Sequence, residues 1–162
     1  MPYQQTVSPC VVRLVVLRGL SPTTQLQCQT LRAEAGRLWT DLLGLHAQAR
    51  AQGRWLGAGD LKQATKGGRY ALHSQSVQAL CQKVAANVDT ATALRRQELA
   101  DTGQIQAEYP HHPKVYQTVV WKDQALQVLP NGRLRLPVGG QRPPLLLPLP
   151  EEDRQAICVG PS

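Results

Sequence analysis

The chain has 162 residues, 42% of them hydrophobic and 4% aromatic with no Phe, which suits one ordinary core built mostly from Leu, Val and Ala. Its net charge of +7 favours a polyanionic partner such as RNA, DNA or an anionic membrane surface, and is also compatible with a protein that is simply basic. The charge is scattered along the chain, which excludes a charged tail.

The first predicted element is a strand over Cys10–Arg18. Its side chains are almost continuously apolar from Val11 to Leu17, as in a central strand covered on both faces. The run is too short to span a bilayer, and no signal peptide precedes it. The four cysteines form no CxxC pair, which indicates buried thiols in a reducing compartment. We therefore expect a cytoplasmic protein with no membrane partner.

A long helical segment is predicted next. Ser21 and Pro22 are typical of a helix start, with Ser21 as N-cap and Pro22 at the first helical position. Apolar residues then recur at three- and four-residue steps up to Ala49. Gly36 is interior to this pattern and predicts a break into two packed helices, and Gly53 is expected to end the second.

Two further helices are predicted after a glycine-rich linker. The first is short and covers Asp60–Thr65, with Asp60 as its cap. The second is long, with Ser74 as its cap and an apolar stripe that continues to about Asp101. Gly103 is expected to end it.

The region after the Pro-bounded linker Glu108–Pro113 has the pattern of strands. Val115–Trp121 is predicted to be extended, and Asn131-Gly132 predicts a hairpin with a type I′ turn, in which both central residues have positive φ. Leu145–Leu149 is a short apolar strand between prolines. Pro148 cannot donate a ladder hydrogen bond, so this strand is expected at an edge or a bulge.

These elements predict an α+β fold. The first strand cannot be stable alone, so we expect it to join the C-terminal strands in a small antiparallel β barrel or sheet, with a long helical insertion between them. The expected division is a split β module over residues 10–20 and 109–150, a helical insertion over 21–108 and a tail over 151–162.

Basic side chains are the candidate binding residues. Arg133 and Arg135 share one face of their predicted strand, and the planar fork of Arg binds two phosphate oxygens. Any one of these residues can equally be solvated surface. The hypothesis is that ten of them line one groove between the helices and the sheet: Lys66, Arg69, Lys83, Arg95, Arg96, Lys114, Lys122, Arg133, Arg135 and Arg142.

No catalytic or metal-binding residues are predicted. His46 and His73 lie beside helix signals, without a nucleophile elbow, and His111-His112 is interpreted as a solvated loop pair without nearby ligands. Gly67-Gly68 lacks the spacing of a phosphate-binding loop and is interpreted as a plain loop. No cofactor is expected.

The three tryptophans have two interpretations. Trp39, Trp55 and Trp121 are of a type that stacks on nucleic-acid bases, but burial in the core is the better interpretation for each. Trp39 lies in the apolar stripe of its helix and is the clearest case.

Three segments resemble the TnpB family, which are transposon-encoded RNA-guided DNA nucleases related to type V CRISPR effectors. They are RLVVLRGLSPTTQ, LHSQSVQALCQKVAANVDTATALRR and YQTVVWKDQALQVLPNGRLRLPVGGQRPPLLLPLP, in the order of the family and spanning Val11 to Pro150. The resemblance implies a split β wedge domain with an inserted helical recognition domain. It also implies guide-type RNA and a DNA target or RNA–DNA heteroduplex as partners.

The sequence departs from that family after Pro150. The family's RuvC-like nuclease half holds metal ions with three dispersed carboxylates, whereas Glu151, Glu152 and Asp153 are adjacent. We therefore expect no enzymatic activity, and a nucleic-acid-binding module that is a truncated relative of such a nuclease. The alternatives are a structural partner that completes a split nuclease with a separate nuclease half, a nuclease-dead repressor, and a non-functional transposase gene remnant.

Overall fold

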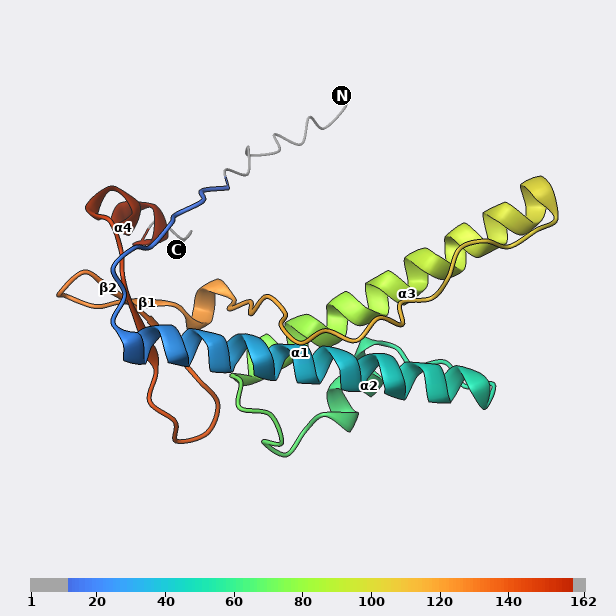
Figure 1. The fold of residues 1–162 in the computed structure, drawn as a ribbon, viewed down its shortest axis with the longest axis horizontal. Helices are drawn as coiled ribbons and strands as arrows, with labels where there is room; N and C mark the ends of the chain where they lie inside the picture. The colour runs from blue at the N-terminus through green and yellow to red at the C-terminus, as the bar shows by residue number, and fades with distance from the viewer. Residues whose placement is uncertain (1–11, 159–162) are drawn as a thin grey trace, which may run out of the picture.

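A computed structural model describes residues 12–158, with side chains described up to Arg154 (Figure 1). Long helices make up most of this range, and three short strands lie near the beginning of the first helix. The elements in chain order are α1 (Pro22–Ala51), α2 (Ala58–Ala64), α3 (Ser74–Thr102), the 3₁₀ turn η1 (Asp123–Ala125), β1 (Gln127–Val128), β2 (Arg133–Leu136), β3 (Leu145–Pro148) and α4 (Glu151–Cys158).

α1 is one continuous helix. Ser21 caps it as predicted, because its hydroxyl oxygen accepts a hydrogen bond from the Thr24 N–H at 3.2 Å, and Pro22 is the first helical residue. The predicted break at Gly36 is wrong, since the helix continues through it. Another part of the chain crosses α1 at this point: a Cβ on Gly36 would lie 2.7 Å from the Lys114 carbonyl oxygen. Gly36 therefore permits a close backbone approach.

The other two helical predictions are confirmed, with shifts of one or two residues at their starts. α2 begins before Asp60, whose carboxylate accepts a hydrogen bond from the Gly57 N–H at 2.9 Å. α3 is capped by His73, whose Nδ1 accepts from the Gln75 N–H at 3.3 Å, and it ends at Gly103 as predicted. Over the described residues, no helix combines the length and apolar character that crossing a bilayer requires.

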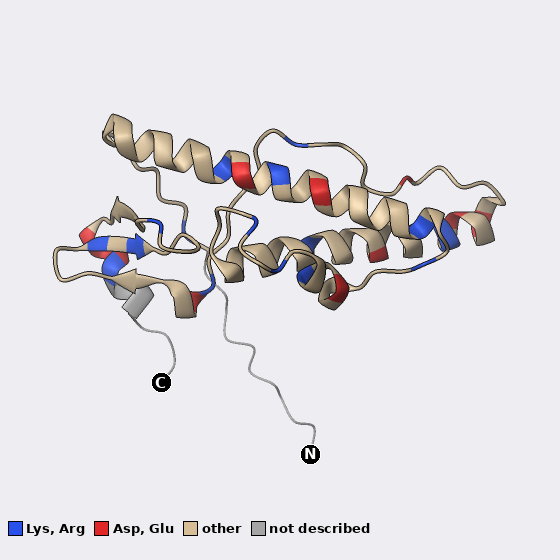
Figure 2. Cartoon of the chain, turned by 90° about the horizontal axis from the view of Figure 1, so that it is seen from below, with Lys and Arg blue, Asp and Glu red and all other residues tan. Residues whose placement is uncertain are grey.

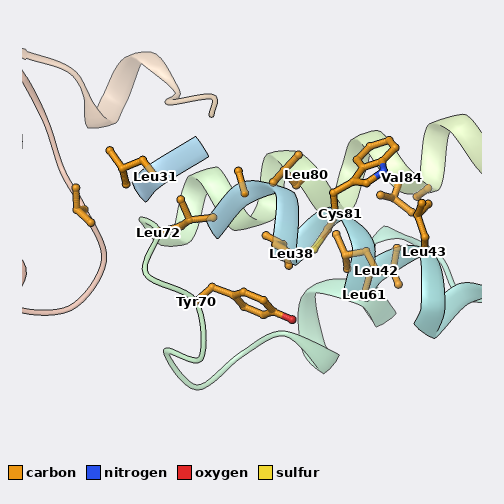
Figure 3. Close-up of a cluster of buried hydrophobic side chains, with 14 of the residues drawn as sticks. Leu31, Leu38, Leu42, Leu43, Leu61, Tyr70, Leu72, Leu80, Cys81 and Val84 are labelled. Atoms are coloured by element: carbon orange, nitrogen blue, oxygen red, sulfur yellow. The ribbon is translucent and has the colours of Figure 1, made fainter. Parts of the chain in front are cut away.

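One hydrophobic core joins the helices to the sheet. α1 and α3 contact each other and run in the same general direction in Figure 1. The chain that joins them returns toward the start of α3, and α2, which lies on this stretch, contacts α3. Their buried side chains meet in the cluster drawn in Figure 3. The hairpin region contributes to the same cluster. Its buried members are Leu31, Ala35, Leu38, Trp39, Leu42, Leu43, Leu61, Tyr70, Leu72, Leu80, Cys81, Val84, Ala85, Val88, Leu136, Val138 and Leu145.

The predicted hairpin forms, with a different turn. β1 pairs antiparallel with β2, with Val128 opposite Leu134. The Gly132 N–H donates to the Leu129 carbonyl at 2.9 Å, and Gly132 alone in this turn has positive φ, +77°. Pro130 and Asn131 therefore occupy the central positions of a type I turn that ends in a left-handed glycine. The predicted type I′ turn is wrong because Asn131 keeps a negative φ.

The sheet is antiparallel with the order β1-β2-β3, and it is not closed into a barrel. β3 pairs only with β2 in the described structure, with Leu136 opposite Leu145, so the predicted edge position of the strand containing Pro148 is confirmed. α1 contacts β3, and α4 contacts β1. The α+β class is thus confirmed, while the barrel form is not observed.

The predicted first strand does not join the sheet. Cys10 and Val11 lie outside the described residues, and no strand is formed between residues 12 and 20. Val12 and Leu14 are 89% and 92% exposed, so the apolar pattern does not reflect burial here. The segment contacts the C-terminal part through an ion pair, with 3.1 Å between the Arg13 guanidinium and the Asp153 carboxylate.

Residues 104–122, which we call the return segment, lead from the end of α3 back across α1 to the sheet (Figure 1). The prediction of a strand over Val115–Trp121 is wrong, because the backbone of this segment bonds to helices instead. The Gln117 N–H donates to the Arg32 carbonyl of α1 at 3.0 Å, and the Lys114 N–H to the Thr40 hydroxyl at 3.2 Å. These groups are then unavailable for pairing with a strand.

Candidate nucleic-acid interface

A hollow of about 340 Å³ opens where four parts of the chain meet. They are the end of α2, the loop that follows it, the first turn of α3 and the loop between β2 and β3. We call this hollow the basic pocket. Its lining includes Gly67-Gly68 and Gly139-Gly140, which present backbone rather than side chains to the space.

Four cationic residues are part of the lining of the basic pocket, together with apolar residues such as Leu72 and Val77. The four are Lys62, Lys66, Arg69 and Arg142, and none of the described residues that line the pocket is acidic. The first turn of α3 also lies in its wall and contains no acidic residue. A helix N-terminus carries a partial positive charge, so it adds to the field of the four cations. Figure 2 shows that Lys and Arg are distributed over helices, loops and strands of the molecule. The pocket therefore favours an anion.

Side chains of α1 hold the loop that carries Arg69. Glu34 accepts hydrogen bonds from the Ala71 N–H at 2.9 Å and from the Arg37 guanidinium at 2.5 Å. Arg37 also donates to the Arg69 carbonyl at 2.8 Å. The hydrogen bond from Arg37 holds the pKa of Glu34 below its usual range, with smaller contributions from Ala71 and from the Arg142 charge. The carboxylate is thus ionised and fixes the pocket wall.

Tyr70 anchors the same loop in the core. Its hydroxyl donates to the Asp41 carboxylate at 2.7 Å, and its ring is 5% exposed. Burial, followed by the hydrogen bond to Asp41, raises the pKa of Tyr70 to about 12, so the phenol stays protonated. The guanidinium of Arg37 lies 4.5 Å from the ring centroid. The neighbouring Arg69 is therefore attached to a fixed support.

The structure brings three of the ten predicted residues into the basic pocket, namely Lys66, Arg69 and Arg142. Two others, Lys83 and Lys114, lie over the ring of Trp39, 5.8 and 4.5 Å from its centroid. Trp39 itself is 4% exposed, which confirms its predicted place in the core.

The remaining five predicted residues lie elsewhere. Arg133 and Arg135 are on β2 and do not line the pocket. Arg96 and Lys122 are exposed, on α3 and at the end of the return segment. Arg95 lies 4.9 Å from the ring centroid of Tyr109 and donates to the Ala107 carbonyl at 2.5 Å. The ten side chains thus form several separate groups, and three of the ten residues line the basic pocket.

A second cluster surrounds Trp55, in the link between α1 and α2. The ring of His46 meets it edge to face at 5.0 Å, and that of Tyr109 at 6.3 Å. Arg50 lies 4.2 Å from the Tyr109 centroid and bonds to His46 Nδ1 at 2.9 Å. Trp55 is 48% exposed, so its predicted burial in the core is wrong. Trp121 is only partly buried, and its indole N–H donates to the Pro137 carbonyl at 2.8 Å.

No family model matches the chain, and no match was found among curated proteins or among solved structures.

Sequence reasoning left two features of the basic pocket out of the candidate site. Lys62 lies on α2, four residues before Lys66 of the following loop, and lines the same space. Gly67-Gly68, interpreted as a plain loop, forms part of the wall. One sequence pattern indicates Lys62 and the glycine pair together. Gly67-Gly68 and the basic residues Lys62, Lys66 and Arg69 all precede the start of α3 at Ser74 by a short distance. Within the described residues, no group of three His, Cys, Asp or Glu side chains is placed to hold a metal ion.

His46 is expected to make stability depend on pH. It is fully buried, and burial lowers its pKa, with the Arg50 charge lowering it further and Asp89 acting in the opposite direction. The folded state therefore binds this proton less readily than the unfolded chain, whose His titrates near about 6.5. The stabilisation is complete above that pH and is lost as the pH falls below it. Denaturant unfolding from about pH 7.5 to about pH 5.5 measures the loss.

The matched variant is His46→Gln, which keeps a polar side chain without a titrating group in this range. We expect the pH dependence to become flatter in this variant. An equal decline in stability in both proteins would contradict the assignment to His46.

Proposed function

We propose that the protein is a nucleic-acid-binding module that binds the phosphate backbone of RNA and has no catalytic residues of its own. The observation that carries the proposal is the basic pocket. Four cations and a helix N-terminus converge on a hollow of about 340 Å³ with no acidic residue in its described lining. Phosphate is the anion that a backbone ligand presents to such a surface, and Arg and Lys are its usual partners.

The chemistry of the pocket favours backbone recognition over base reading. Lys62 and Lys66 are flexible point charges. Arg69 and Arg142 each donate to a backbone carbonyl, of Ala64 and Gly139, and keep further N–H groups that suit phosphate oxygens. Sequence specificity would then come from elsewhere, as it does where base pairing with a guide RNA selects the target. The relation to TnpB-like nucleases, with guide RNA, an RNA–DNA heteroduplex and a separate nuclease half as partners, stays a prediction, and the backbone-binding proposal does not depend on it.

The test is filter binding of a structured RNA over a salt series from about 50 to about 200 mM. Binding carried by phosphates releases counterions, so the logarithm of the association constant is expected to fall linearly with the logarithm of the salt concentration. An affinity that does not change over this range would overturn the proposal.

A pair of double variants locates the binding site. Lys62→Gln with Lys66→Gln removes two pocket cations. Each lost contact with a single-strand phosphate lowers the salt slope by about 0.7, so the slope of the double variant is expected to be shallower by about 1.4. Arg96→Gln with Lys122→Gln removes the same charge from exposed positions outside the pocket. Equal slopes in the two variants would show that net charge, and not the pocket, carries binding.

A further inference from the structure

Trp55 has an unusual position for a large aromatic side chain in this protein. It is 48% exposed, whereas Trp39 is 4% exposed. It lies in the short link between α1 and α2, where it is supported from inside by two rings. These are His46, fully buried on α1, and Tyr109 of the return segment, which both meet Trp55 edge to face. One part of the indole is therefore fixed by packing, and the other part is free to solvent.

The rings beneath Trp55 are themselves held in place. Arg50 of α1 and Arg95 of α3 lie over Tyr109, at 4.2 and 4.9 Å from its centroid. The Glu98 carboxylate accepts the N–H groups of Gln106 and Ala107, each at 2.8 Å, which fixes the return segment just before Tyr109. A supported aromatic surface loses little conformational freedom when a ligand stacks on it.

Arginines surround this aromatic surface. Arg54 precedes Trp55 in the chain, is exposed and donates to the Gln52 side chain at 2.6 Å. None of Arg50, Arg54 and Arg95 takes part in an ion pair within the described structure. On α3, the Glu98 carboxylate is occupied by the backbone of the return segment, and the Asp89 charge acts on His46, where it opposes the lowering of the His46 pKa. An exposed indole among arginines without carboxylate partners combines the two elements that bind single-stranded nucleic acid, a stacking surface and positive charge.

We propose that Trp55 stacks on an unpaired base of a single-stranded nucleic acid, with Arg54 and Arg95 facing the adjacent phosphates. This inference rests on the proposed function, and it adds the ligand class: a strand with at least one unstacked base. α2 separates the two sites, since Trp55 precedes its first residue, Lys62 lies in its last turn and Lys66 lies just after it. A seven-residue helix is about 10 Å long, so a strand of a few nucleotides is long enough to reach both.

The experiment compares two oligomers of about 12 nucleotides, oligouridine and an abasic strand with the same number of phosphates. The wild-type protein is expected to bind oligouridine about 10-fold more tightly, and base stacking is expected to quench the fluorescence of the exposed tryptophan. Trp55→Ala is expected to bind both oligomers alike, at the affinity of the abasic strand. Trp55→Phe keeps an aromatic face and is expected to recover most of the preference.

Each result separates this inference from the proposed function. Binding of neither oligomer, with the structured RNA still bound, overturns stacking alone, whereas loss of binding to the oligomers and to the structured RNA overturns both. If the wild type binds oligouridine and the abasic strand equally well and the salt dependence is retained, stacking alone is overturned. This is the result expected if Trp55 contacts a protein partner instead. A preference that survives in Trp55→Ala also overturns stacking. Thermal unfolding checks that folding is intact. Trp55→Phe should match the wild type closely, whereas Trp55→Ala, which loses the packing on His46 and Tyr109, should keep a single transition with a lower midpoint.

Discussion

Gly36→Ala is expected to destabilise the protein by about 3 kcal/mol, although Ala is the better helix former. The reason is the return segment, which crosses α1 at this glycine. The new Cβ would lie 2.6 Å from the carbonyl carbon of Val115 and 2.7 Å from the Lys114 carbonyl oxygen. Both are backbone atoms, so no side-chain rotation relieves the overlap. Denaturant unfolding monitored by circular dichroism measures the change.

Gly44→Ala is the matched control on the same helix. A Cβ there would meet nothing within 4 Å, so only the intrinsic helix preference acts, and we expect stabilisation of up to about 1 kcal/mol. The two identical substitutions should therefore have opposite signs. If Gly36→Ala also stabilised the protein, the return segment would not cross α1 at this point.

Leu38→Ala is expected to lower the free energy of unfolding by about 3 kcal/mol. Leu38 is completely buried and lies in the cluster of Figure 3, with side chains of α1, α2 and α3 around it. Because the hairpin residues Leu136 and Leu145 belong to the same cluster, we expect helices and sheet to unfold together in a single transition. Far-ultraviolet circular dichroism and tryptophan fluorescence should give the same midpoint, shifted to lower denaturant in the variant.

The same substitution on the outside of the helix provides the comparison. Leu26 is 63% exposed, and Leu26→Ala is expected to change stability by less than about 0.5 kcal/mol. Two separate transitions in the wild type would show that the helices and the sheet are independent domains, as the predicted division into a β module and a helical insertion implies.

Local signals in the sequence located α1, α2 and α3, although the N-caps of α2 and α3 are Gly57 and His73 and not the predicted Asp60 and Ser74, and α4 was not predicted. Ser21-Pro22 and Gly103 lie where α1 begins and α3 ends, because a cap is determined by the chemistry of a few neighbouring residues. The predicted break at Gly36 is wrong. Its glycine is required by a contact with Val115, which lies far away in the sequence, and such a contact has no local signature.

Strands were predicted less well for a related reason. The alternating residues of Val115–Trp121 fit a strand, but in the folded protein the Gln117 N–H and the neighbouring Lys114 N–H have their hydrogen-bond partners on α1 and not in the sheet. At Val12 and Leu14, apolar character predicted burial, and the side chains remain exposed. Strand formation depends on which partner is within reach, and periodicity does not contain that information.

The candidate site was predicted in part. The basic residues near Gly67-Gly68 do line one hollow with Arg142, although Arg133 and Arg135 lie apart from it on β2. Alternation along a strand identified their shared face, but it could not show which other element that face meets. Trp55 was assigned to the core on residue type alone. Its exposure depends on where the link between α1 and α2 leaves the helix, which only the three-dimensional structure shows.

The shared core also has a consequence for synthesis on the ribosome. Leu31 and Ala35 of α1 belong to the same buried cluster as Leu136 and Leu145, which emerge from the ribosome much later. Until then the apolar face of α1 is exposed on the nascent chain, so a holdase chaperone is expected to bind α1 during translation. Release should follow the appearance of β3, because contacts of such large sequence separation form last.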